Sequence, residues 1–151
     1  MDLVAGLERV PDGPVRRMFA AAGSHDIEAL VAEFSQSYIN VTPNHPQRNF
    51  TGTQQVRANW TSLFAGIPDL ALKIHDAVAD DDRTVWVEWS LHGHRLDGSA
   101  VELAGVAIFA VDQGKLAGVH FYLEPVERTS GDVDVAVRTT AGPGLPVEPE
   151  P

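Results

Sequence analysis

The chain has 151 residues, 44% of them hydrophobic and 21% charged, which fits one globular domain with a proper core rather than a disordered polymer. A formal net charge of −10 without Lys/Arg clusters argues against nucleic-acid and anionic-membrane partners, and the absence of cysteine excludes disulfides, thiolate catalysis and Cys-ligated metals. The N-terminus resembles no signal peptide and no run approaches the ~20 apolar residues of a membrane span, so we expect a cytoplasmic protein.

The first half of the chain predicts three helices, because apolar residues recur at helical spacing between helix-starting and helix-stopping residues. These helices cover residues 12–23, 24–34 and 53–69. Between the second and the third, the β-branched and aromatic run 38–43 predicts a strand that Pro43 ends. The polar segment 44–52 predicts a loop.

From Leu70 the apolar period changes to two, which predicts strands. Four long strands, separated by turn residues, cover residues 70–79, 84–94, 100–111 and 115–126. Helices followed by an antiparallel meander indicate an α+β fold with the helices on one face of a sheet.

The two ends of the chain are expected to lie outside the domain, which spans residues 14–125. Residues 1–13 form an N-terminal lead. Residues 126–151 are rich in Gly, Pro and acids and predict a mostly disordered tail. Within the tail, the alternating "DVDVAV" leaves a short edge strand as the alternative.

This order of elements, with "SHDIEALVAEF", "FTGTQQVRANWTSLFAGIPDL", "DDDRTVWVEWSLHGH" and "VELAGVAIFAVDQGKLAGVHFYLEP" in sequence, resembles the nuclear transport factor 2-like superfamily and, more narrowly, its SnoaL-like polyketide cyclase branch. The resemblance implies a cone-shaped, curved, mostly antiparallel sheet wrapped on three N-terminal helices, the cystatin-like α+β barrel. It also implies a deep apolar pocket and commonly a homodimer through the outer face of the sheet. Members include isomerases, dehydratases, epoxide hydrolases, cyclases and pure binding modules, so the fold alone does not name the activity.

The catalytic residues of these relatives do not carry over. The general-base Asp, the Tyr and the protonated Asp of ketosteroid isomerases fall at Thr42, Met18 and Ala107. In limonene epoxide hydrolases and SnoaL-like cyclases, the acid on the last strand falls at Phe121. The Arg and second Asp of the hydrolases fall near Trp89 and Leu91, so the sequence lacks the usual catalytic carboxylates.

Strand alternation divides the predicted sheet into two faces. The inward face, expected to bind substrate, includes Trp89, Leu91, Ala107, Val119, Phe121 and Leu123. The outward face gathers Glu88, His92, His94, Glu102, His120, Tyr122 and Glu124. His92 and His94 share a side and suggest a metal site, but an exposed or dimer-facing polar sheet is the interpretation we adopt. We therefore expect no metal and no cofactor.

Polar groups of the expected pocket come from the first strand and the loop after it. Tyr38, Asn40 and Thr42 share one face, and "Y-I-N" loosely resembles the Tyr-x-Asn pair that positions water in limonene epoxide hydrolases. Without acids, this pair would orient a ligand. His45 is the plausible neutral-pH base near the pocket mouth, or else a solvated loop histidine. Tyr38, Asn40 and His45 are thus the candidate catalytic residues.

Met18 of the first predicted helix and Thr42 are expected to bind substrate, and three further side chains are candidates for the same role. Arg48, in the same loop, either meets a ligand carboxylate or is solvated. Asn59 interrupts the apolar face of the third helix, so it faces either the pocket or solvent. Trp60 lies on that helix too, as a pocket or a core residue.

The sequence therefore predicts an apolar pocket that selects its ligand by shape. Our leading hypothesis is a cyclase or isomerase of polyketide or terpenoid-like natural-product biosynthesis that holds the reactive conformer in a dry cavity. The alternative is a non-catalytic small-molecule-binding or dimerisation module. The expected partners are an apolar or polycyclic small molecule and a second copy of the chain.

Overall fold

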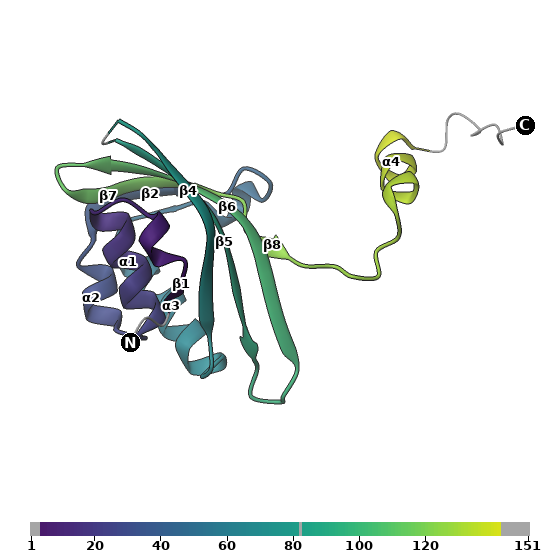
Figure 1. Cartoon of the computed structure of the whole chain (residues 1–151), viewed down its shortest axis with the longest axis horizontal. Helices are drawn as coiled ribbons and strands as arrows, with labels where there is room; N and C mark the ends of the chain where they lie inside the picture. Colours follow the sequence, from purple (N-terminus) through teal and green to yellow (C-terminus); the bar gives the residue numbers. More distant parts are fainter. Residues whose placement is uncertain (1–3, 82, 143–151) are drawn as a thin grey trace, which may run out of the picture.

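The computed structural model describes residues 4–81 and 83–142, and it has three helices packed on one side of a large curved sheet (Figure 1). The helices on the sheet are α1 (Pro14–Gly23), α2 (Ile27–Val31) and α3 (Thr53–Gly66). The strands are β1 (Val4–Ala5), β2 (Phe34–Val41), β3 (Phe50–Thr51), β4 (Ala71–Asp80), β5 (Thr84–His94), β6 (Ala100–Asp112), β7 (Lys115–Phe121) and β8 (Glu124–Pro125). The expected α+β class and cystatin-like arrangement are confirmed.

The sheet runs in the order β1-β4-β5-β6-β7-β2-β3, and β8 pairs with β6. The four central strands pair antiparallel, as a meander should. At the two sides the pairing is parallel, β2 with β7 and β1 with β4. The β1 strand lies in the segment that we expected to be only a lead, because Val4 and Ala5 align with Leu72 and Lys73; residues 1–3 lie outside the described part.

Helix α2 is shorter than the predicted range 24–34. The Asp26 side chain caps it by accepting a hydrogen bond from the Ala29 amide at 3.1 Å. It ends at Val31, and Phe34 already pairs with Leu116 of β7. Pairing with a long neighbouring strand therefore takes precedence over the helical spacing, and β2 starts four residues earlier than the predicted strand 38–43.

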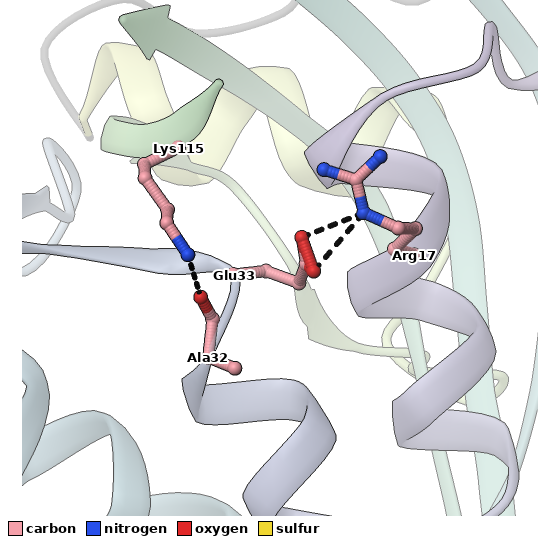
Figure 2. A network of polar contacts seen from close by, with 4 residues as sticks. All are labelled: Arg17, Ala32, Glu33 and Lys115. Atoms are coloured by element: carbon pink, nitrogen blue, oxygen red, sulfur yellow. Dashed lines mark hydrogen bonds and ion pairs between the residues drawn. The ribbon is translucent and has the colours of Figure 1, made fainter. Parts of the chain in front are cut away.

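A network of polar contacts fixes the point where β2 begins (Figure 2). Arg17 of α1 donates to the Glu33 carboxylate at 2.8 Å, and the Lys115 ammonium of β7 donates to the Ala32 carbonyl. The Glu33 side chain is largely buried, whereas Arg17 is exposed. The contacts join α1, the end of α2 and β7 at one corner, and so hold the neighbouring Phe34 in place.

The predicted strand 115–126 is two strands in the structure. A Cβ at Gly105 would lie 2.2 Å from the Tyr122 carbonyl oxygen, so glycine permits the backbones to approach closely there. The Tyr122 amide still bonds to the Val106 carbonyl at 2.9 Å, but regular pairing of β7 stops at Phe121. The short β8 then continues along β6.

One hydrophobic core lies between the helices and the inner face of the sheet. In β5 the burial alternates strictly, with Val85, Val87, Trp89 and Leu91 inward. Phe19 of α1 packs edge-on against Trp89, with ring centroids 5.0 Å apart. The outer face has no helix on it in the described structure (Figure 1).

The C-terminal segment differs from our expectation. It forms α4 (Val133–Ala141), which stands away from the sheet (Figure 1) and is exposed along its length. Asp132 caps it by accepting from the Val135 amide at 3.1 Å, a feature that favours a helix over the alternative edge strand. Residues 143–151 of the predicted tail lie outside the described residues. None of the helices described is long and apolar enough to cross a bilayer.

Candidate functional site

A cavity of about 230 Å³ lies between α3 and the inner face of the sheet. Its buried lining consists of Met18, Phe34, Tyr38, Thr42, Val56, Trp89, Phe109 and Val119. Nearer the surface it is lined by the half-buried Asn40, Phe50, Trp60, Leu63 and Phe121 and by the exposed Arg48 and Asn59. The cavity is thus apolar in its depth and polar at its mouth.

Aromatic rings make up much of the apolar wall. Trp89 meets Phe121 with centroids 6.3 Å apart, and Phe34 meets Tyr38 edge-on at 4.8 Å. The buried Trp89 Nε1 has no hydrogen-bond partner in the described part of the chain.

A ladder of hydrogen bonds runs along the β2 side of the cavity. The Tyr38 hydroxyl donates to Asn40 Oδ1 at 3.1 Å, and Asn40 Nδ2 donates to Thr42 Oγ1 at 3.2 Å. Alternation along β2 and the residue that follows it puts these three side chains on the inner side. The second N–H of Asn40 and the O–H of Thr42 remain as donors, which suits a carbonyl or hydroxyl oxygen of a ligand.

Tyr38 serves this ladder in its neutral form. Its side chain is 3% exposed, and desolvation raises the pKa of its hydroxyl well above the ordinary value. Tyr38 is therefore a hydrogen-bond donor at physiological pH and a poor general base.

The mouth loop, residues 43–49, is fixed by its own hydrogen bonds. The Thr42 amide donates to Asn49 Oδ1 at 2.7 Å, and the His45 amide donates to the Thr42 carbonyl at 2.9 Å. A short 3₁₀ turn, η2 (Pro46–Arg48), then brings Arg48 to the cavity. His45 itself turns away, because its Nε2 lies 2.8 Å from Glu124 Oε1 on β8.

The structure brings most of the sequence-predicted site residues together and leaves four out. Those that line the cavity are Met18, Tyr38, Asn40, Thr42, Arg48, Asn59, Trp60, Trp89, Val119 and Phe121. His45 is held by Glu124 outside the lining. Leu91, Ala107 and Leu123 point inward but belong to the packed core. The roles assigned to all of these residues stay predictions.

Five lining residues were not among the predicted site residues: Phe34, Phe50, Val56, Leu63 and Phe109. Val56 and Leu63 belonged to the apolar face of the predicted third helix, and Phe109 to the inward face of a predicted strand, so periodicity could have identified them. Phe34 was assigned to a helix and Phe50 to a loop, which hid their side-chain directions.

The lining limits the chemistry. Among the described residues that line the cavity there is no Asp, Glu or His. Over residues 4–81 and 83–142, no three His, Asp or Glu side chains gather as metal ligands would. The cavity therefore offers a ligand its shape, the neutral donors of the ladder and one guanidinium.

His94, one of the two histidines that suggested a metal site, has a partner on the outer surface. Its ring Nδ1 lies 2.7 Å from Asp69 Oδ2, and this hydrogen bond lowers the pKa of the Asp69 carboxyl.

Comparison with solved structures finds the same fold in proteins of low sequence identity. A protein from Mycobacterium tuberculosis in complex with estradiol-17β-hemisuccinate superposes with a TM-score of 0.63 at 15% identity, covering 82% of this chain and 98% of that one. A Catenulispora acidiphila protein with a ketosteroid isomerase-like fold, in complex with trimethylamine, gives 0.61 at 20%, covering 75% and 86%. A Pseudomonas putida protein provisionally named a polyketide cyclase gives 0.59 at 21%, covering 72% and 88%.

Comparison by sequence identifies the family. No curated protein matches the chain. The family model of the SnoaL-like domain matches residues 15–119, which is most of the folded part. This range covers α1 except Pro14, α2, α3 and strands β2 to β6, and of the cavity-lining residues described above only Phe121 lies beyond it. The chain therefore belongs to the SnoaL-like domain family and has the nuclear transport factor 2-like fold.

Proposed function

We propose that the protein is a cyclase or isomerase of natural-product biosynthesis, acting on a small polyketide- or terpenoid-like molecule. The observation that carries this proposal is an apolar cavity with a ladder of oriented neutral donors along one side. An isomerisation, or a cyclisation by intramolecular addition, neither gains nor loses atoms: the proton of the C–H bond that breaks is returned to another atom of the same molecule. Ordering two reacting ends in a dry cavity lowers their barrier without a titrating group, by several kcal/mol in favourable cases.

The size of the cavity defines the substrate further. Pockets for drug-sized ligands measure about 300–1,000 Å³, and this one is about 230 Å³. The sequence predicted an apolar or polycyclic small molecule, and a molecule with one or two rings fits this volume better than a polycyclic one. The estradiol derivative bound by the Mycobacterium tuberculosis protein supports a ring-bearing apolar ligand as the class.

The second candidate is a non-catalytic binding module. The lack of Asp, Glu and His among the described lining residues favours it, since general acid–base catalysis typically contributes about 10²–10⁴-fold in rate. Both candidates use the same cavity, so a binding measurement alone does not separate them.

The experiment therefore measures binding and turnover together, with linear β-polyketones and cyclic terpenoid enones as the compounds. Val119→Phe puts a ring into the cavity, because Val119 is 3% exposed and lines it. Val133→Phe is the matched control on α4, away from the cavity, where Val133 is 72% exposed. We expect the parent and the control to bind and convert at least one compound, and Val119→Phe to do neither.

Each other outcome counts against one candidate or against both. Binding without conversion in the parent chain supports the binding module. Conversion that survives Val119→Phe would place the reaction outside the cavity and contradict both candidates. Circular dichroism and an unfolding curve check that Val119→Phe folds, because overpacking costs about 1–3 kcal/mol.

We also propose a homodimer through the outer face of the sheet. Val78, Trp86 and Ile39 are 62%, 46% and 52% exposed there, and cross-strand pairing puts Val78, Trp86 and Ile108 in one row. A row of exposed apolar side chains on an uncovered sheet is an association site. A two-fold pairing of this face with itself would cover it in a closed dimer.

A further inference from the structure

Arg48 is the one arginine among the described residues that lines the cavity. Arg16, Arg17, Arg57 and Arg128 each form an ion pair with a carboxylate. Arg48 forms none with the residues that the structure describes, and the same holds for Arg9, Arg83, Arg95 and Arg138, although the chain carries 21 acidic residues and a net charge of −10. It is exposed, and of the described residues that line the cavity it alone is charged.

The mouth loop holds the backbone of Arg48 beside the cavity. The Arg48 amide donates to the His45 carbonyl at 2.9 Å, within the 3₁₀ turn. The turn is tied at one end to Thr42 through Asn49 and at the other to β8 through the His45–Glu124 pair. Because the loop is tied on both sides, the Arg48 backbone stays beside the cavity, and only its side chain has to be ordered when a ligand binds.

The Arg48 side chain belongs to the mouth of the cavity, whereas the interior of the cavity is apolar. Phe34, Val56, Trp89 and Val119 line its buried part, and the polar ladder follows one side. A ligand that fills it must therefore have an apolar body, with its polar end at the mouth. Arginine presents parallel N–H donors that match a carboxylate in a bidentate manner, and an anion is the group that an unpaired guanidinium binds best.

From this arrangement, and resting on the proposed function of the cavity, we propose that the ligand is a carboxylic acid with one or two rings. Its carboxylate pairs with Arg48 at the mouth, and its apolar body lies among the aromatic side chains. Arg48 thereby determines specificity, since neutral compounds of the same shape lose this contact. The remaining donors of Asn40 and Thr42 serve a second oxygen of the ligand.

The test compares two probes of the same shape, 2-naphthoate and its methyl ester, by calorimetric titration. We expect the parent chain to prefer the carboxylate by about tenfold, which corresponds to ~1.4 kcal/mol. Arg48→Met should abolish this preference and leave the affinity for the ester within about twofold. Arg48→Lys should retain part of it, because the charge stays while the bidentate geometry is lost.

Two controls keep the outcomes distinct. Arg9→Met removes the same charge from an exposed turn outside the cavity and should leave the preference unchanged. Val119→Phe should abolish the binding of both probes. Equal affinities for the two probes, or a carboxylate preference that survives Arg48→Met, would overturn the role of Arg48 and leave the cavity as a ligand site. Failure of both probes to bind the folded parent, or binding that survives Val119→Phe, would contradict the proposed function as well.

Discussion

Raising the pH above about 10 is expected to destabilise the protein through Tyr38. In the unfolded chain a tyrosine ionises with a pKa of about 10, whereas burial raises the pKa of Tyr38 in the folded protein. A raised folded pKa means that the stabilisation is complete below about pH 10 and is lost as the pH rises towards the folded pKa. The loss amounts to about 1.4 kcal/mol per pH unit in this window.

The assay is urea unfolding of the parent chain and of Tyr38→Phe at about pH 9 and pH 11. All other side chains are the same in the two proteins, so the difference between the two pH-induced losses isolates Tyr38. We expect the parent to lose about 1.4 kcal/mol more than Tyr38→Phe. At neutral pH the free energy of unfolding of Tyr38→Phe should be lower than that of the parent by about 0.5–1.5 kcal/mol, because the variant lacks the hydrogen bond to Asn40.

Tyrosinate absorbance provides an independent readout of the same event. The signal of Tyr38 should appear with unfolding and not before it. Equal losses of stability in the two proteins, or a Tyr38 signal in the folded state near pH 10, would refute the reasoning. Tyr38 would then be open to hydroxide and could act as a base in the cavity.

Three further predictions concern the cavity, the mouth loop and the outer face. Adding a ring with Val119→Phe should abolish ligand binding in calorimetry, and unchanged affinity would place the ligand elsewhere. His45→Ala should reduce any turnover by less than about tenfold, because His45 pairs with Glu124 outside the lining; a loss at the ~10³-fold level, with fold and binding intact, would make His45 the general base. Trp86→Lys should turn a dimer into a monomer in light scattering, and a parent chain already monomeric at the same concentration would contradict the dimer.

Periodicity predicts which face of a strand a side chain occupies, and in this sheet the predicted and observed faces agree. Trp89 and Phe121 lie on the inner side, where alternation puts them, and the helix 53–69 agrees with α3 except at its C-terminal end. The order of helices and strands is local information, which the chain carries in its apolar spacing and turn residues. The fold was predictable for that reason.

Whether an inward side chain lines the cavity or packs in the core is a different property, and the sequence does not predict it. Ala107 and Leu91 face inward as predicted, yet other core side chains fill the space in front of them, so they do not line the cavity. Whether a side chain meets another side chain or empty space depends on how the helices sit over the sheet. That arrangement comes from contacts across the whole fold.

Contacts between residues far apart in the sequence account for two further differences between the prediction and the structure. Glu124 holds His45 from 79 positions away along the chain, and no local pattern reveals such a pair. Likewise, β2 begins at Phe34 because β7 is there to pair with it, although residues 24–34 have helical spacing. In both cases a tertiary contact decides between local structures of similar free energy.

The most direct test of the account is a crystal structure of the protein with 2-naphthoate bound. The account predicts the naphthalene rings among Phe34, Trp89 and Val119, and the carboxylate within hydrogen-bonding distance of Arg48. Density for the rings on the outer face of the sheet, beside Trp86, or an empty cavity at saturating ligand would contradict it.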